Sequence, residues 1–248
     1  MATALVGLVL LSACTGARPR LADEPTVTSE RADGGASTTT TAAPPQSKVA
    51  QALGDAIDVF PDATSDVAAQ RITGADATSA PNIPLVFLVK SEGDDRLEVH
   101  LPVGPNGSTG WVRRDDVTLA SVNHRIEVRL AEHRIRVLDG NEVVVDEPIG
   151  VGTTDRPTPG GVHYLKELLQ PPDPTGPYGT YAYVLSGSST ELTSFNEGQG
   201  VIGIHGTNDP ASIGQDVSSG CIGLDNAVID RLVNEIGLPL GTPVEILA

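Results

Sequence analysis

Basic side chains are scarce in this sequence. It has 16 Lys and Arg residues against 32 Asp and Glu, which gives a formal net charge of −16 over 248 residues. Nucleic acids are bound through basic faces that neutralise phosphates, and polybasic segments hold proteins to anionic lipid. The charge balance therefore excludes a nucleic-acid partner, and it excludes an electrostatic hold on a membrane surface.

Cysteine is also scarce, because Cys14 and Cys221 are the only two. A chain of this length buries a core without disulfide support. An apolar run at residues 5–11 leads into Leu11-Ser12-Ala13-Cys14, which resembles a bacterial lipobox. The run is too short to span a membrane and is typical of the apolar part of a signal peptide.

We therefore expect residues 1–14 to be a lipoprotein signal peptide whose Cys14 becomes lipidated. This would place the chain outside the cytoplasm, in the cell envelope, anchored by lipid to the outer face of the cytoplasmic membrane. No Lys or Arg precedes the apolar run, so an ordinary signal peptide in which Cys14 has no role is the alternative. If Cys14 is lipidated, Cys221 is a free thiol in an oxidising compartment and needs a chemical explanation.

Residues 15–48 contain too few large apolar side chains to form a hydrophobic core. Of these 34 residues, 23 are Gly, Ala, Ser, Thr or Pro, and the only large apolar side chains are Leu21 and Val27. Such a segment cannot offset the entropy of its own ordering. We expect a disordered linker rich in Ser, Thr, Pro and Ala.

Residues 49–121 are predicted to form a small β domain. Apolar and polar residues alternate at 97–101, a turn sequence follows at 104–107, and the stretch Gly110 to Val117 resembles the closing strand of bacterial SH3-like modules. We expect an SH3-like domain, and its role is not indicated by the sequence.

Residues 122–248 are predicted to form a second, larger β domain. Alternating residues between 125 and 145 indicate a meander of three strands, with further strands near 162–166, 180–185, 200–204 and 244–247. One helix is expected, capped by Asp225 or Asn226 and ended by Gly237, with an apolar stripe of Val228, Leu232, Val233 and Ile236. The predicted fold class is mainly β, a β-sandwich-like domain with one helix near its C-terminus.

The candidate catalytic residues lie between residues 202 and 224. His205 ends a β-type segment, and Cys221 follows sixteen residues later in a glycine-rich stretch. A thiol becomes a nucleophile when a neighbouring histidine accepts its proton. A buried cysteine that acts as a small apolar side chain is the alternative. These two residues are too few ligands for zinc, so no metal and no other cofactor is expected.

The same residues carry a resemblance to a known family. His205-Gly206, a spacer, and then Ser218-Ser219-Gly220-Cys221 are similar to the signature of YkuD-type L,D-transpeptidase catalytic domains, and Thr158-Pro159-Gly160-Gly161 is similar to that family's Thr-Pro-x-Gly turn. The resemblance covers residues 122–247. Arg outnumbers Lys by 13 to 3, which indicates a GC-rich genome, and we expect an actinobacterial lipoprotein.

The resemblance implies a role for each residue of the motif. Cys221 would be the nucleophile, His205 its base, and the Gly206 carbonyl the group that orients the imidazole. Backbone N–H groups around Gly220 and Cys221 would form the oxyanion hole. Four further residues are candidates for contacts with substrate, although Tyr164 also fits the packing of an expected strand: Ser218, Ser219, Thr207 and Tyr164.

The implied activity is peptidoglycan cross-linking. Stem peptides would serve as donor and acceptor, the product would be a 3→3 cross-link formed through a cysteine thioester, and carbapenem-type inhibitors would acylate the enzyme. Two departures keep alternatives open, because Ser219 stands where the signature has His and Gly223 where it has Arg or Asn. One alternative is a catalytically weak wall-binding scaffold, and another is an L,D-carboxypeptidase that uses water at the same site. Arg156 and Lys166 are the candidate replacements for the missing cation.

Overall fold

The computed structural model describes residues 46–79, 82–189 and 200–248. The predicted signal peptide, Cys14 and nearly all of the predicted linker lie outside these residues. Residues 42–248 form one compact unit. Among the described residues, no helix is long and apolar enough to cross a membrane.

The first sheet is built from residues 47–122 and has five strands in the order β6-β5-β4-β1-β7. All its neighbours pair antiparallel, and a separate hairpin of β2 and β3 leads into a single helical turn, α1. The bounds are β1 Ser47–Ala52, β2 Ala56–Val59, β3 Gln70–Thr73, α1 Gly74–Ala77, β4 Val86–Glu92, β5 Arg96–His100, β6 Thr109–Arg113, the 3-10 turn η1 Arg114–Asp116 and β7 Val117–Val122.

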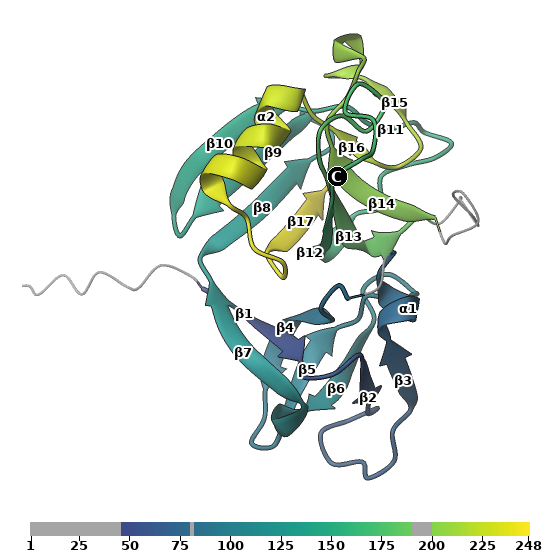
Figure 1. The fold of residues 1–248 in the computed structure, drawn as a ribbon, viewed down its shortest axis with the longest axis vertical. Helices are drawn as coiled ribbons and strands as arrows, with labels where there is room; N and C mark the ends of the chain where they lie inside the picture. Colours follow the sequence, from purple (N-terminus) through teal and green to yellow (C-terminus); the bar gives the residue numbers. More distant parts are fainter. Residues whose placement is uncertain (1–45, 80–81, 190–199) are drawn as a thin grey trace, which may run out of the picture. The chain divides into compact units, whose positions relative to one another are not determined.

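The second sheet is built from residues 124–247 and has eight strands in the order β10-β9-β8-β17-β12-β13-β14-β16 (Figure 1). Its strands are β8 His124–Arg129, β9 Arg134–Asp139, β10 Glu142–Pro148, β12 Gly161–Leu169, β13 Ala182–Ser188, β14 Val201–His205, β16 Ile222–Gly223 and β17 Pro243–Leu247. A short parallel pair stands apart from it, formed by β11 Val151–Gly152 and β15 Asp216–Ser218.

The chain passes from the first sheet to the second between β7 and β8, near residue 122. The division into domains at residues 49–121 and 122–248 stays a prediction, since residues 42–248 form one compact unit. The fold class is mainly β, as predicted. The strands expected near 162–166, 180–185, 200–204 and 244–247 are all present as β12, β13, β14 and β17.

The C-terminal strand lies in the middle of the second sheet rather than at an edge. β17 pairs parallel with β8 and antiparallel with β12. Val244 and Ile246 are buried while Glu245 and Leu247 are exposed, which is the alternation of a strand covered on one face. The last strand therefore joins the opening meander to the strands that carry the predicted site.

One helix covers this sheet, as the sequence predicts. α2 spans Asn226–Arg231 and is capped by Asp225, whose carboxylate accepts a hydrogen bond from the Ala227 N–H at 2.8 Å. A π-helical turn, η3 (Leu232–Ile236), continues it, and Gly237 ends it in the left-handed conformation with φ of 67°. Ile229, which the predicted stripe omits, is fully buried together with Leu232, whereas Val228, Val233 and Ile236 are only partly buried.

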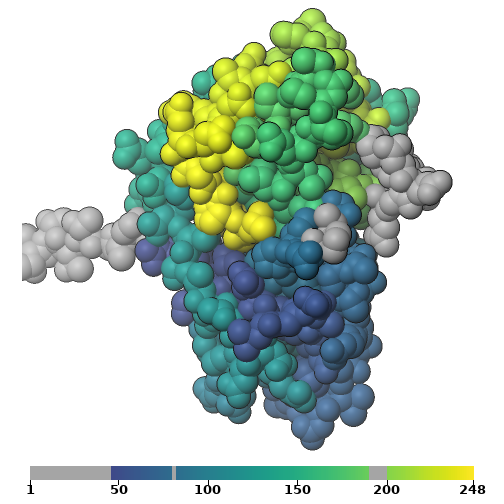
Figure 2. All heavy atoms as spheres, viewed as in Figure 1, coloured from purple at the N-terminus to yellow at the C-terminus, as the bar shows by residue number. Residues whose placement is uncertain are grey.

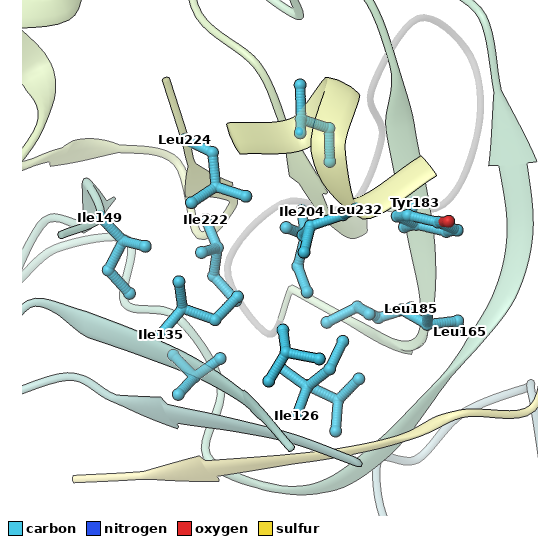
Figure 3. Close-up of a cluster of buried hydrophobic side chains, with 14 of the residues drawn as sticks. Ile126, Ile135, Ile149, Leu165, Tyr183, Leu185, Ile204, Ile222, Leu224 and Leu232 are labelled. Atoms are coloured by element: carbon cyan, nitrogen blue, oxygen red, sulfur yellow. The ribbon is translucent and has the colours of Figure 1, made fainter. Parts of the chain in front are cut away.

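The core of the second sheet is mainly aliphatic, with Tyr183 as a buried aromatic member. In Figure 3, side chains from the sheet and Leu232 from the helical segment point into one cluster. Ile204 of β14 and Ile222 of β16 belong to this cluster and have no exposed surface. Because both strands are anchored through these residues, the opposite faces of the same strands are fixed in position.

Candidate active site

Strands β14 and β16 bring the predicted nucleophile and base to one side of the sheet. The two strands pair parallel, with Ile204 opposite Ile222 and His205 opposite Gly223. Side chains alternate along a strand, so the burial of both isoleucines in the core directs His205 and Cys221 to the other face. Cys221 follows His205 by sixteen positions in the sequence, and the strand pairing brings these two segments together.

The His205 ring is held in one orientation by the backbone next to it. Its Nδ1 lies 2.5 Å from the Gly206 carbonyl oxygen. A carbonyl can only accept a hydrogen bond, so Nδ1 carries the proton of the neutral ring and Nε2 keeps its lone pair. Burial lowers the pKa of His205 below its ordinary value of 6.5, and the bond to Gly206 opposes that shift. A neutral imidazole with a basic Nε2 is therefore present at neutral pH.

The Cys221 side chain is half-buried and carries a free thiol. Burial raises the pKa of this thiol above its ordinary value of 9.0, and a hydrogen bond with the Gly203 backbone opposes the shift. The two shifts together favour a neutral thiol beside a neutral imidazole. This arrangement suits proton transfer to His205 during attack, rather than a thiolate formed in advance.

Tyr178 also belongs to the candidate site, because its ring contacts His205. It was not predicted as a site residue from the sequence. Its ring meets the His205 ring edge to face, with centroids 5.1 Å apart and planes at 76°. Burial raises the pKa of the Tyr178 phenol, and a negative charge on Cys221 raises it further, so the phenol stays protonated. Tyr178 comes from the segment between β12 and β13, and its ring contact brings this segment against the site.

Ser218, one of the predicted contact residues, holds the nucleophile loop together. The Ser218 hydroxyl donates to the Cys221 carbonyl at 2.6 Å, and it accepts the Gly220 N–H at 3.1 Å. The Gly220 N–H is thus paired with Ser218 in this structure, and its place in the oxyanion hole stays a prediction. Thr207 is similarly engaged, because its hydroxyl accepts the Asp209 N–H at 3.0 Å. Ser219 is half-buried at the tip of this loop.

The structure does not bring Tyr164 to this site. Tyr164 has no exposed surface and packs in a small cluster with Val49, Val86, Leu88 and Val122. A side chain that is closed off in this way cannot contact a substrate at Cys221, so its prediction as a substrate-binding residue is wrong. Burial raises the pKa of its phenol well above the usual value, so the group is neutral.

The family follows from the sequence of the second sheet. The sequence model of YkuD, the L,D-transpeptidase catalytic domain, matches residues 123–246 of this chain. The chain belongs to the YkuD-type L,D-transpeptidase family. The YkuD protein of Bacillus licheniformis is 34% identical over 126 residues, which are 51% of this chain and 67% of that protein. The ErfK/SrfK protein of Salmonella typhimurium is 30% identical over an alignment of 183 residues, which covers 63% of this chain and 54% of that protein.

Solved structures resemble the chain more distantly. L,D-transpeptidase 3 of Mycobacterium tuberculosis, in complex with a faropenem-derived adduct, is 15% identical with a TM-score of 0.40, and the likeness covers 56% of this chain and 73% of that one.

The segment from Gly152 to Thr158, which leads into the Thr-Pro-x-Gly turn of the YkuD-type domain, lies against the nucleophile loop. Thr158 is buried, and its hydroxyl accepts the Gly152 N–H at 2.9 Å. The Thr153 N–H donates to the Ser218 carbonyl at 3.1 Å, which ties this segment to the strand that leads into Cys221. Of the two candidate cations, Arg156 lies in this segment, where its backbone N–H donates to the Thr153 carbonyl, whereas Lys166 lies on β12, separated from β14 by β13.

Gly223 departs from the YkuD-type pattern, although packing does not require a glycine at this position. Its backbone pairs with Gly150 through two hydrogen bonds, of 2.9 and 3.0 Å. A Cβ at this position would meet nothing nearer than the Gly150 carbonyl oxygen at 4.0 Å. The site therefore has room for the first atom of a side chain, and packing does not explain the missing Arg or Asn.

Gly220 is expected to be indispensable to the geometry of the loop. Its φ is 109°, a backbone conformation that L residues rarely adopt, and an added Cβ would lie 3.3 Å from the Pro157 carbonyl oxygen. Gly220→Ala should cost about 1–3 kcal/mol in backbone strain and displace Cys221, slowing thiol acylation by about tenfold or more. Unfolding curves and acylation rates measure both effects.

The control for this variant is the same substitution at an unstrained glycine. Gly54 has no positive φ, and a Cβ there would approach only the Ala56 carbonyl oxygen at 4.0 Å. Gly54→Ala should leave both quantities close to wild type. Equal acylation rates for Gly220→Ala and Gly54→Ala would contradict a requirement for glycine next to the nucleophile.

Proposed function

We propose that this chain is a peptidoglycan L,D-transpeptidase that forms 3→3 cross-links through a thioester on Cys221. The observation that carries the proposal is the placement of Cys221 and His205 on one face of two paired strands. The His205 tautomer leaves its Nε2 lone pair available, and Tyr178 lies beside both residues. Membership of the YkuD-type family supports the same chemistry.

The first half of the proposed reaction forms the acyl-enzyme. The Cys221 sulfur attacks the carbonyl carbon of the L-centre that precedes the terminal D-residue of a donor stem, and the thiol proton passes to His205 Nε2. The C–N bond then breaks, and His205 returns the proton to the amine of the departing D-residue. The product of this half is a thioester between Cys221 and the shortened stem.

The second half transfers the acyl group to an acceptor. An amine of a neighbouring stem attacks the thioester carbonyl, His205 takes its proton, and the C–S bond breaks to return the thiol. Of the two backbone donors expected for the oxyanion, Gly220 already donates to Ser218, so we assign this role to the Cys221 N–H. Water in place of the amine would make the same site an L,D-carboxypeptidase.

The test separates an active site from an inactive scaffold. The full-length protein is incubated with a carbapenem, and its intact mass is measured over time. An active site gives a stable mass increase equal to one carbapenem. If the mass stays unchanged under long incubation, the protein is a wall-binding scaffold and the proposal fails.

We further propose that the protein is held at the outer face of the cytoplasmic membrane by a lipid on Cys14. The lipobox-like residues 11–14 support this location. Cys14→Ser should move the protein from the detergent phase to the soluble fraction, because lipid and not charge provides the hold. Wild-type protein that is found soluble, with a first residue other than Cys14, would contradict the anchor.

A further inference from the structure

The side chain of Asn226 does not serve the helix on which it stands. Asn226 is the first residue of α2, but the N-cap is Asp225, whose carboxylate already accepts the Ala227 N–H at 2.8 Å. Asparagine is also a poor helix former away from the cap position. The amide of Asn226 therefore needs another explanation.

The Asn226 amide oxygen is enclosed by two glycines from segments far apart in the sequence. A Cβ on Gly179 would lie 2.1 Å from Oδ1, and a Cβ on Gly206 would lie at the same distance. Both glycines are buried, so the amide fills the space that their missing side chains leave. On the face drawn in Figure 2, green atoms of the segment before β13 lie against yellow atoms of the C-terminal segment.

Asn226 also makes a hydrogen bond to the backbone that orients His205. The Thr207 N–H donates to Asn226 Oδ1 at 3.1 Å. This N–H belongs to the same peptide group as the Gly206 carbonyl, whose oxygen lies 2.5 Å from His205 Nδ1. One rigid, planar peptide group thus donates its N–H to Asn226 on one edge, and its carbonyl accepts from His205 on the other.

Two physical effects follow from this arrangement. The bond to Thr207 fixes the plane of the peptide group and therefore the direction of the Gly206 carbonyl. It also polarises the group, and hydrogen bonds in such a chain strengthen one another where the surroundings are buried. Both effects favour a proton on Nδ1 and a lone pair on Nε2.

We propose that Asn226 is a positioning residue that holds the His205 imidazole in the Nδ1–H tautomer through the Gly206–Thr207 peptide group. The inference rests on the proposed role of His205 as the base. Asn226 acts through the peptide group and not on the substrate.

The first test observes the ring itself. Nitrogen NMR of the full-length protein reports the protonation of each imidazole nitrogen, and the His205→Ala spectrum identifies the His205 signals. Asn226→Ala should introduce the Nε2–H tautomer, which the wild type lacks. Asn226→Asp keeps an acceptor oxygen for Thr207, so it should retain the Nδ1–H tautomer and raise the pH midpoint of His205 through its added charge.

The second test uses the rate of carbapenem acylation. Asn226→Ala should slow acylation by about tenfold or more, and Asn226→Asp should recover most of the rate. Asp225→Ala is the matched control, because it removes the cap of the same helix without touching the Gly206–Thr207 peptide. It should leave the His205 tautomer unchanged.

The outcomes separate this inference from the proposed function. An unchanged His205 tautomer and pH midpoint in Asn226→Ala would overturn the positioning role. If that variant does not fold, a His205 midpoint in Asn226→Asp equal to wild type would overturn it instead. A wild-type protein that no carbapenem acylates would refute the proposed function, while the NMR result would still decide the role of Asn226.

Discussion

Replacing His205 by alanine is expected to slow carbapenem acylation of the protein by about a hundredfold or more, the usual scale for the loss of a general base. The reason is that the Cys221 thiol is protonated at neutral pH. Burial raises the pKa of Cys221 above 9.0, so at neutral pH the group is a thiol that needs a proton acceptor before it can attack. Nε2 of His205 is that acceptor, because Nδ1 is engaged by Gly206.

The pH dependence of acylation should also show that His205 is the base. His205 accepts a proton only when it is neutral, and burial lowers its pKa below 6.5. The rate should therefore fall as the pH drops through a midpoint below 6.5, and it should stay level from there through neutral pH. His205→Ala should lose this inflection.

A histidine elsewhere in the same sheet provides the control. His124 begins β8, on the far side of β17 and β12 from β14, and His124→Ala should acylate at the wild-type rate with the wild-type pH profile. A rate that follows only the thiolate population, with no inflection below 6.5, would show that the base is not His205.

Cys221→Ala is expected to abolish acylation and cross-linking while leaving the protein folded. The substitution removes one half-buried sulfur atom, and the contacts that fix the loop run through Ser218, the Thr153 backbone and Gly220. The thermal unfolding curve should therefore stay close to wild type. Intact mass and analysis of cross-linked stem peptides measure the loss of activity.

The second cysteine gives a matched control for this variant. Cys14→Ser removes the other cysteine of the chain and should acquire the full carbapenem mass at the wild-type rate. Adduct on Cys221→Ala, or its absence on Cys14→Ser, would place the nucleophile outside the strand pair described above.

Local patterns predicted the strands and the helix because the spacing of apolar residues reflects which face is buried. The segment from Val244 shows this well, since its alternation predicts a strand. That alternation cannot indicate that β17 lies between β8 and β12, because strand order depends on pairing between distant segments. The π turn at Leu232–Ile236 could not be predicted either, because it departs from the regular helical period.

The residues of the candidate active site also divide into those that a local motif predicts and those that it does not. Cys221, His205 and Gly206 were predicted because they stand in one short motif whose chemistry is specific. Tyr178 reaches His205 from a loop with no periodic pattern, so its contact with the ring could not be predicted from neighbouring residues.

Tyr164 and Asn226 show what a single local signal leaves out. Tyr164 lies near the Thr-Pro-x-Gly turn in sequence, but the strand directs its ring into a cluster with the first sheet. Asn226 was considered only as a helix cap, since its bond to Thr207 joins residues 19 positions apart.

The most direct test of the central claim is the product that full-length protein forms from stem tetrapeptides. We expect dimers that have lost the terminal D-residue of the donor and are joined 3→3, together with a transient acyl group mapped to Cys221. Release of tripeptide without dimers would show a carboxypeptidase on the same thioester. Recovery of unchanged tetrapeptide, with no acyl group on Cys221, would contradict the account at its centre.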